Sequence, residues 1–507
     1  MQRRQLMAGA VAMGLAGRTR LHAAETAGSP FDAQTVRKLA RALAAEPYRE
    51  PDARLPDALA KLSYDAYRGI RFDPGQSLWR GRGLPFEAQF FHRGSLYADR
   101  VDIFEVADGQ AQALQYRPEQ FEFGPTPRPE QQDLGYAGFR LHGTINRADY
   151  FDEIAVFLGA TYFRGVAKHQ QYGLSARGLS IDTADPRGEE FPAFRSFWIE
   201  RPQPNAGSIV VHGLIDSRRA TAAMRCSIRP GDDTIFDVEL TLFPREDIAQ
   251  PGIATMTSMF LFDPADRAGI DDYRRAVHDS DGLMMLTGRG EELWRPVTNP
   301  QTLQVSSFVD TSPRGFGLMQ RKRDLRDFED LEARYERRPS LWVEPIGDWG
   351  DGVVQLVEIP TKDEVHDTIV AFWRPKQPLQ AKSEHNFTYR LHWTTAAPIR
   401  STLARFTDTR TGTGSTERSR RFVLDVAGGA LKALAPDAKP RLVVSTDKGK
   451  IQNAVAHANP DQGGWRISFE LLPDDARAAE LRAVLVQGDT PLTETPLTET
   501  WILRWTA

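Results

Sequence analysis

Residues 353–359 read VVQLVEI and residues 387–393 read FTYRLHW. In both stretches apolar side chains recur at every second position, which is typical of a half-buried β-strand. Similar short runs rich in Val, Ile, Phe, Tyr and Trp continue from about residue 70 to residue 395, and Gly, Pro and Asp turns separate them. Many strands with few helices predict an all-β fold that contains a large antiparallel β-sandwich.

Few segments in front of or within this region depart from the strand pattern. Apolar residues of 31–45 and 56–68 recur at three- and four-residue intervals, so we expect two short helices there. Residues 321–338 (RKRDLRDFEDLEARYERR) are highly charged, and we expect a helical or irregular excursion on the surface of the sandwich.

The pattern changes again near the C-terminus. Residues 408–420 (DTRTGTGSTERSR) contain almost no apolar side chain and predict a linker or long loop. The remaining segment, 421–507, contains about seven short strand-like runs, a size and spacing typical of an immunoglobulin-like sandwich. We therefore expect a β-sandwich over 25–397, a linker over 398–420 and a small second sandwich over 421–507.

The first 24 residues have the features of a signal peptide. Arg3 and Arg4 form a charged start, an apolar run from Leu6 to Gly17 follows, and small residues at 23 and 24 suit cleavage. The run is too short to span a bilayer, which takes about 20 residues. The paired arginines before a weakly hydrophobic run favour twin-arginine export, with an ordinary secretory signal as the alternative. Together with the single cysteine, this start predicts a periplasmic protein without a membrane span.

Composition excludes several classes of protein. The 507 residues are 41% hydrophobic and 26% charged, which suits a globular chain and argues against disorder. The formal net charge is −4 and no long basic run occurs, so nucleic-acid binding has little support. Cys226 is the only cysteine, which excludes an intrachain disulfide and a cysteine-rich metal site.

Several familiar catalytic and cofactor motifs are missing. Residues 173–178 (GLSARG) have one residue too many for a nucleophile elbow. There is no phosphate-binding Walker loop, no H-E-x-x-H pair and no strand–GxGxxG–helix unit, and the ten histidines lack ligand spacing. We therefore expect neither a metal nor a cofactor.

Two acidic clusters remain as candidates for chemistry. Asp363, Glu364 and Asp367 lie between two predicted strands and would occupy a hairpin tip, and a second cluster holds Asp279 and Asp281. Two opposed carboxylates are what glycoside cleavage needs, and aromatic rings offer flat faces for sugars. The alternatives are that these acids are solvated turn residues and that the Trp and Tyr side chains belong to the core.

At the same residues the chain resembles the OpgG/OpgD (MdoG/MdoD) family of periplasmic glucan biosynthesis proteins, and the twin-arginine-like start favours the OpgD branch. The resemblance runs nearly from end to end. Its longest stretches are LSYDAYRGIRF (62–72), LPFEAQFFHRG (84–94), YFRGVAKHQQYGLSARGLSIDTA (162–184), GEEFPAFRSFWIERP (188–202), TSMFLF (257–262), VHDSDGL (277–283), GRGEELWRPVTNP (288–300) and VQLVEIPTKDEVHDTIVAFWRP (354–375).

The resemblance implies a two-sandwich fold whose larger part carries a glucan cleft. It also implies action on the β-1,2-linked backbone of osmoregulated periplasmic glucans, by an anomer-inverting endo-β-1,2-glucanase or by a transglycosylase that cyclises the glucan. By position, the family's general acid falls on Asp367 and its second carboxylate, which assists water deprotonation, on Asp279. Further candidates for substrate contact are Glu364, Tyr335, Trp294 and Trp342.

The sequence leaves open whether the protein hydrolyses or transfers sugars, and whether 408–420 closes over the cleft. An alternative from another class is a non-catalytic glucan-binding or assembly factor that cooperates with a membrane glucan synthase. A homodimer is also left open.

Overall fold

The structure is a computed structural model, and it describes residues 28–130, 133–267, 269–434, 438–488 and 494–507. The predicted signal peptide over 1–24 lies outside these residues. No helix in the described ranges is both long and apolar enough to cross a membrane.

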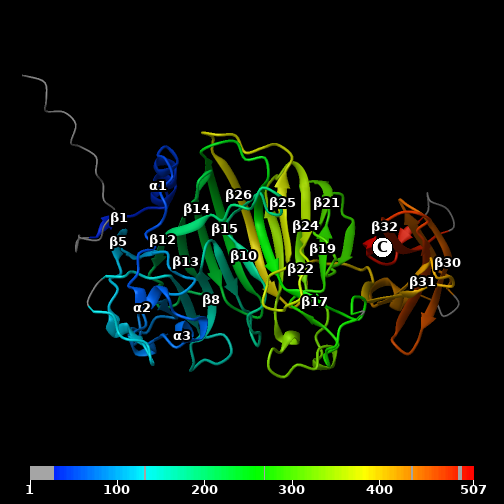
Figure 1. Ribbon diagram of the computed structural model, residues 1–507, viewed down its shortest axis with the longest axis horizontal. Helices are drawn as coiled ribbons and strands as arrows, with labels where there is room; N and C mark the ends of the chain where they lie inside the picture. Colours follow the sequence, from blue (N-terminus) through cyan, green and yellow to red (C-terminus); the bar gives the residue numbers. More distant parts are fainter. Residues whose placement is uncertain (1–27, 131–132, 268, 435–437, 489–493) are drawn as a thin grey trace, which may run out of the picture.

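The described strands form two large sheets, and the sixteen-stranded sheet runs the length of the molecule (Figure 1). Its main path, from edge to edge, is β1 (Ser29–Pro30), β5 (Gln110–Ala113), β4 (Asp102–Ala107), β12 (Ala193–Glu200), β13 (Ile209–Asp216), β14 (Ala220–Arg229), β15 (Thr234–Pro244), β26 (His385–Thr394), β23 (Ser340–Ile346), β22 (Gly315–Met319), β19 (Gly282–Leu286), β20 (Glu292–Pro296), β34 (Thr500–Thr506), β32 (Ala478–Gln487) and β29 (Arg441–Thr446), and β33 (Thr495–Pro496) pairs with β32.

The second sheet has ten strands in the described part of the chain. Its path is β21 (Gln304–Thr311), β24 (Asp351–Glu358), β25 (Ile369–Pro375), β16 (Pro251–Ser258), β10 (Ser175–Arg177), β9 (Tyr162–Gly165), β8 (Asp152–Leu158), β7 (Gly138–Gly143) and β3 (Phe86–Phe91), and β11 (Ser180–Ile181) pairs with β16. The short ribbons β2 (Arg71–Phe72) with β6 (Phe121–Glu122) and β17 (Phe260–Phe262) with β18 (Val277–His278) complete this part.

An aromatic core joins the facing sides of the two sheets. Phe163 of the ten-stranded sheet lies 5.8 Å, between ring centroids, from Phe236 of the sixteen-stranded sheet. Phe236 in turn lies 4.4 Å from Trp393, and these side chains are buried. Offset and tilted ring pairs at such distances stabilise a core beyond the area that they bury. The predicted all-β sandwich is therefore confirmed.

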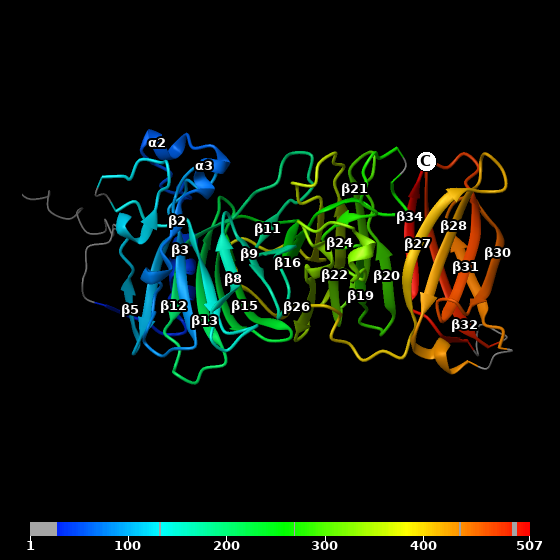
Figure 2. The same ribbon diagram turned by 90° about the horizontal axis from the view of Figure 1, so that it is seen from below.

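Helices are few and lie toward the end opposite to the C-terminal strands (Figures 1 and 2). Helix α1 (Thr35–Ala44) falls within the predicted 31–45 helix and buries Val36 and Ala40. The predicted 56–68 helix is instead two short helices, α2 (Asp57–Ala60) and α3 (Tyr64–Arg68), because Ser63 caps the second with a bond to the Ala66 N–H. Single 3₁₀ turns are η1 (Pro74–Gln76), η2 (Pro118–Gln120), η3 (Leu325–Asp327), η4 (Tyr335–Arg337) and η5 (Gly429–Ala433).

The C-terminal strands form a small sandwich at one end of the molecule (Figure 2). Its four-stranded sheet has the order β27 (Arg405–Thr413), β28 (Arg420–Ala427), β31 (Gly464–Leu472) and β30 (Lys450–Asn459). This sheet shares one apolar core with β32 and β34 of the sixteen-stranded sheet, including Phe422, Phe469 and Trp501.

The predicted loop over 408–420 is wrong for residues 408–413. These residues belong to β27, which pairs with β28 along its length. Threonines 407, 409, 411 and 413 occupy alternate positions, and β-branched residues favour extended backbone even where the composition is polar. The small sandwich thus begins at Arg405, before the expected start at 421.

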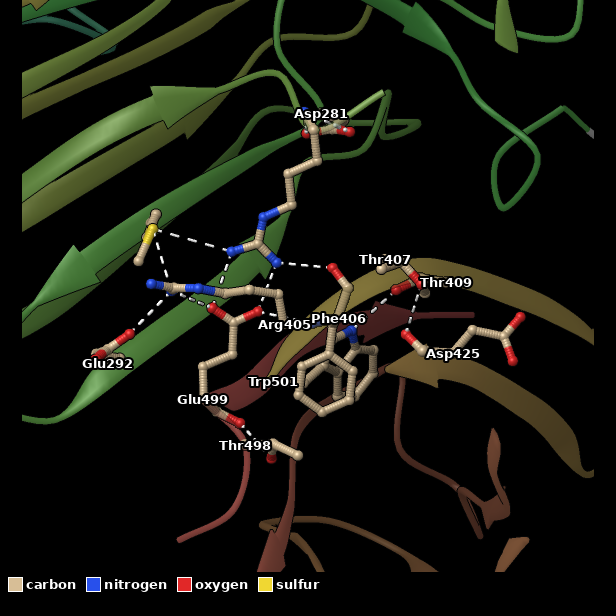
Figure 3. Close-up of polar contacts among 12 residues, drawn as sticks. Asp281, Glu292, Arg405, Phe406, Thr407, Thr409, Asp425, Thr498, Glu499 and Trp501 are labelled. Carbon is tan, nitrogen blue, oxygen red and sulfur yellow. Dashed lines mark hydrogen bonds and ion pairs between the residues drawn. The ribbon is translucent and has the colours of Figure 1, made fainter. Parts of the chain in front are cut away.

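A buried ionic cluster fastens this sandwich to the larger one (Figure 3). Glu499, fully buried, accepts from Arg321 at 2.8 Å and from Arg405 at 2.9 Å, and Arg405 also pairs with Glu292 at 2.9 Å. Burial alone would raise the pKa of Glu499, yet the two guanidinium groups hold that pKa below its usual value. Because the backbone N–H of Arg321 donates to Asp281, the cluster reaches the segment that contains Asp279.

Candidate functional site

The outer side of the ten-stranded sheet carries a polar layer near its centre. Phe163, Ala176 and Met256 lie in register on β9, β10 and β16, and all three are buried in the core. Since side chains alternate along a strand, their neighbours in the chain point to the other side of the sheet. These outward residues are Tyr162, Arg164, Ser175, Arg177, Thr255 and Thr257.

Asp367 lies at the edge of this polar layer, at the end of the connection from β24 to β25. Its carboxylate accepts a hydrogen bond of 3.2 Å from the hydroxyl of Thr257. The next residue, Thr368, donates its N–H to the carbonyl of Ser258 at 2.9 Å, which fixes the backbone beside Asp367. Asp367 is partly exposed, so a substrate can reach it.

Asp279 occupies the turn between β18 and β19 and is 4% exposed. Its backbone N–H donates to the carbonyl of Met259 at 2.8 Å. Its carboxylate accepts from the guanidinium of Arg338, which lies 59 residues away in the sequence. Arg338 thus neutralises a carboxylate that burial would otherwise penalise.

One short segment separates the two aspartates. Asp279 is bonded through its backbone to Met259, and Thr368, the neighbour of Asp367, is bonded to Ser258. Ser258 and Met259 are consecutive, so the two acids flank the same point of the chain, where β16 passes into β17. The structure therefore brings together two carboxylates that are 88 positions apart in sequence numbering.

The charges around Asp279 act in opposite directions. Burial raises the pKa of Asp279, the Arg338 cation lowers it, and the negative charge of Asp367 raises it again. Arg164, which donates to Ser175 at 2.6 Å, is a further cation that lowers it. The net shift is upward, so the ionised form of Asp279 depends on the two arginines.

Glu364 and Tyr335 lie around this pair and contact other protein groups. Glu364 forms an ion pair of 2.8 Å with Arg274, and its side chain is 41% exposed. Tyr335 is 2% exposed, so the expected surface location of this part of 321–338 is wrong. The Arg338 guanidinium carbon lies 4.2 Å from the centroid of the Tyr335 ring, and the ring therefore supports the arginine that binds Asp279.

Trp294 and Trp342 lie away from this pair, in the core that the two sandwiches share. They are 4% and 1% exposed, which leaves no face for a sugar, so the expectation of substrate contact is wrong for both. Glycines make room for these rings: a Cβ at Gly282 would lie 2.3 Å from a ring atom of Trp294, and one at Gly315 would lie 2.2 Å from a ring atom of Trp342.

His278 likewise belongs to the core. It is fully buried, it stacks on Phe260 at 5.4 Å between ring centroids, and its ring nitrogens have no hydrogen-bond partner among the described residues. Burial holds the pKa of His278 well below its usual value, so the ring stays neutral.

Sequence reasoning missed Arg338, Arg164 and Thr257. Arg338 ends the charged run 321–338, whose composition indicates solvent exposure, and Arg164 and Thr257 are ordinary strand residues. Gly173 makes room for Arg338, because a Cβ at Gly173 would lie 2.9 Å from the Cβ of Arg338, but only the structure shows this contact. Next to Arg338, a hollow of about 450 Å³ is lined by Asn146, His169, Gln170, Gln171 and Arg337.

Comparison with known proteins identifies the family of the chain. The family model described as "Periplasmic glucan biosynthesis protein, MdoG" matches residues 31–505. The chain belongs to this family. It is similar to proteins named "Glucans biosynthesis protein G" from Rhodopseudomonas palustris (56% identical, 100% of both chains), Bradyrhizobium diazoefficiens (55%, 100% of both chains) and Vibrio cholerae (50%, 94% of this chain and 87% of the relative).

Membership in the glucan biosynthesis family confirms the resemblance found in the sequence, and a role in glucan biosynthesis follows from it. The three relatives carry the G name, so the preference for the D branch stays a prediction.

Proposed function

We propose that this protein is a periplasmic enzyme that acts on the β-1,2-linked backbone of osmoregulated periplasmic glucans with inversion of the anomeric centre. Asp367 serves as the general acid and Asp279 as the second carboxylate. The observation that supports this proposal is the placement of the two acids on either side of Ser258–Met259, where one is partly exposed and the other is paired with Arg338.

Inversion requires a single displacement at the anomeric carbon. Asp367 donates its proton to the bridging oxygen as the bond to that oxygen breaks, while Thr257 holds the carboxyl in place. A hydroxyl group attacks from the opposite face of the sugar, and its proton passes toward Asp279. The separation of acid and base in inverting enzymes leaves room for a water molecule or a relay between them.

The nature of the attacking hydroxyl decides the product. Water would make the protein an endo-β-1,2-glucanase, whereas a hydroxyl of the same glucan would make it a cyclising transglycosylase. Both reactions use the same two acids and differ in whether water reaches the acceptor position. A periplasmic location is part of the proposal, and the description of the family model, which contains the word periplasmic, supports it. The twin-arginine route is also proposed, on the paired arginines Arg3 and Arg4.

The second candidate function is a non-catalytic glucan-binding or assembly factor for a membrane glucan synthase. The names of the family and of the relatives favour it, because they specify biosynthesis and name no cleavage. In that case the two acids would bind glucan hydroxyls, and the small C-terminal sandwich would be the surface that meets the synthase.

Incubation with linear β-1,2-glucan separates these functions. The wild type is expected to shorten or cyclise the chains, and Asp367→Asn and Asp279→Asn are each expected to lower turnover at least about a hundredfold. Asp363→Asn is the control, because Asp363 is an exposed acid of the same connection. Mass spectrometry identifies a cyclised product, which is one water lighter than the linear chain of equal length.

Unchanged chain length with the wild type over a range of pH, together with measurable glucan binding, would favour the assembly factor. Wild-type turnover by Asp367→Asn would remove Asp367 from the mechanism.

A further inference from the structure

Arg177 is a buried cation whose hydrogen bonds are incomplete. It lies on β10 in the polar layer and is 2% exposed. Nη1 donates to Glu189 at 2.6 Å, but Nε and Nη2 have no partner among the described residues. A buried donor without a partner is costly, and such groups point to a ligand or to function.

Two aromatic rings flank this guanidinium. Its central carbon lies 5.2 Å from the centroid of Tyr162 and 4.9 Å from that of Phe191. Phe191 is 54% exposed, which is unusual for a phenylalanine whose ring contacts a buried cation. Contact with Arg177 therefore positions the ring, while part of its surface stays free for a ligand.

The segment before Phe191 is fixed through Glu189 and Glu190, and Gly188 has open space where a side chain would lie. The hydroxyl of Thr183 donates to Glu189 at 2.8 Å, so Glu189 joins this segment to Arg177. Gly188 has a φ of +108° and open space around its Cα, a conformation that suits a residue without a side chain. Glu190, directly before Phe191, is held by its N–H bond to the Ile181 carbonyl and by an ion pair with Arg219. Access to the two unpartnered donors of Arg177 therefore requires rotation of the Phe191 side chain.

This cluster is continuous with the proposed catalytic acid. Tyr162, whose ring contacts Arg177, has a pKa that burial raises and that the charges of Arg177 and Asp367 shift in opposite directions. Thr257, the partner of Asp367, lies opposite Ser175, two residues before Arg177 on β10. Two residues along a strand span about 7 Å, a distance of the order of one sugar unit.

On the other side, the cluster borders an open hollow of about 550 Å³, a size typical of ligand sites. Phe191, Gly188 and Glu189 line it together with Tyr48 and Arg218. The Arg177 cluster thus lies between the polar layer around Asp367 and the hollow.

We propose that Phe191 and Arg177 form a sugar-binding subsite for a glucan unit beyond the one held at Asp367. The free surface of Phe191 stacks on the sugar ring, and hydroxyl groups of that sugar accept from the two unpartnered donors of Arg177 when the Phe191 side chain rotates. This inference rests on the proposed function, because the ligand that it names is the glucan.

Kinetics and binding of the full-length protein with linear β-1,2-glucan test the subsite. Phe191→Ala is expected to raise KM and Kd about tenfold for long chains with kcat unchanged, and Phe191→Tyr is expected to restore both constants. The matched control is Tyr64→Ala, because Tyr64 is also 54% exposed and also lies under an arginine, at 6.0 Å. Oligosaccharides too short to reach the subsite should not distinguish Phe191→Ala from the wild type.

Arg177→Lys tests the donors separately, since lysine keeps the charge and loses the fork of N–H groups. Its thermal unfolding and circular dichroism check that it folds, and its Kd is expected to rise like that of Phe191→Ala.

The possible outcomes are distinct. If the wild type is active and Phe191→Ala matches Tyr64→Ala in KM and Kd, the subsite is overturned and the proposed function stands. If the wild type binds glucan without turning it over, the catalytic proposal fails and the Kd values still decide the subsite. If the wild type does not bind glucan, both proposals are overturned.

Discussion

Arg338 donates a hydrogen bond to the buried carboxylate of Asp279. The pair joins the turn after β18 to the segment before β23, and the Tyr335 ring lies against the Arg338 guanidinium. Since the same cation lowers the pKa of Asp279, Arg338 determines both the position and the charge of this carboxylate.

Replacement of Arg338 should therefore change the pH dependence of turnover. In Arg338→Lys the positive charge remains but the planar fork is lost, so we expect turnover to fall at least tenfold. The pKa of Asp279 should rise as its partner weakens, so the acid limb of the pH–rate profile should move to higher pH. Rate measurements from pH 4 to pH 9 check both effects.

Arg337→Gln is the control for this change, because the adjacent Arg337 side chain is 51% exposed. If the acid limb of the pH–rate profile lies at the same pH in Arg338→Lys and in the wild type, the assigned role of Arg338 is wrong.

Thr257 should act through Asp367. Thr257→Val removes the hydroxyl that donates to Asp367 and keeps the shape of the side chain, so we expect turnover to fall about tenfold with little change in fold. Thr257→Ser keeps a hydroxyl and should recover most of the rate. Equal rates for the valine and serine variants would show that this hydrogen bond does not position the acid.

Gly282 should tolerate no side chain. The Cβ of Gly282→Ala would lie 2.3 Å from the Trp294 ring, and overpacking of this kind costs about 1–3 kcal/mol. Gly412→Ala is a matched control, since Gly412 also lies in a strand but has no atom within 4 Å of the added Cβ. Chemical denaturation measures the free energy of unfolding of both variants. Equal values would contradict the packing of the Trp294 ring against Gly282.

The ionic cluster at the junction should be sensitive to the loss of one partner. Glu499→Gln leaves Arg321 and Arg405 without their shared carboxylate, and breaking a buried pair in this way costs about 3–5 kcal/mol. The exposed pair of Lys61 and Asp57 provides a contrast, since Asp57→Asn should change the free energy of unfolding by less than about 1 kcal/mol. Thermal unfolding compares the two; similar small shifts would contradict a structural role for Glu499.

His92 should make the fold sensitive to acid. It is 3% exposed, and burial lowers its pKa to about 4 from 6.5, so the unfolded chain binds its proton more readily than the folded chain. The stability that depends on the neutral His92 ring is fully present above pH 6.5. As the pH falls toward 4, the free energy of unfolding decreases by about 3 kcal/mol for this reason. Urea denaturation at pH 7 and pH 4.5 should show a smaller loss of stability in His92→Gln than in the wild type.

The alternating stretches predicted the strands of the large sandwich well. Residues 353–358 fall in β24 and residues 387–393 in β26. Their alternation was visible because alternate side chains, such as Val354 with Leu356 and Leu391 with Trp393, enter the same core. The strand at residues 408–413 was not predicted, because its alternating residues are threonines, which are β-branched but not hydrophobic.

The site was predictable only in part. The family resemblance assigned roles to Asp367 and Asp279, and those roles stay predictions. The sequence does not show that Trp294 and Trp342 face a second sandwich. Arg338 was not predicted for a related reason. The composition of a charged run is the same whether its last residue is exposed to solvent or pairs with a buried carboxylate.

The last strand of the chain, β34, pairs in parallel with β20, and β20 in turn pairs with β19, the strand that follows Asp279. Leu293 of β20 pairs with Thr500 of β34, so a segment far away in the sequence completes the sheet beside the acidic turn. Contacts between such distant parts of a chain form slowly. A variant truncated before Thr500 lacks β34, which leaves β20 with an unpaired apolar edge. Such a variant should be prone to aggregation.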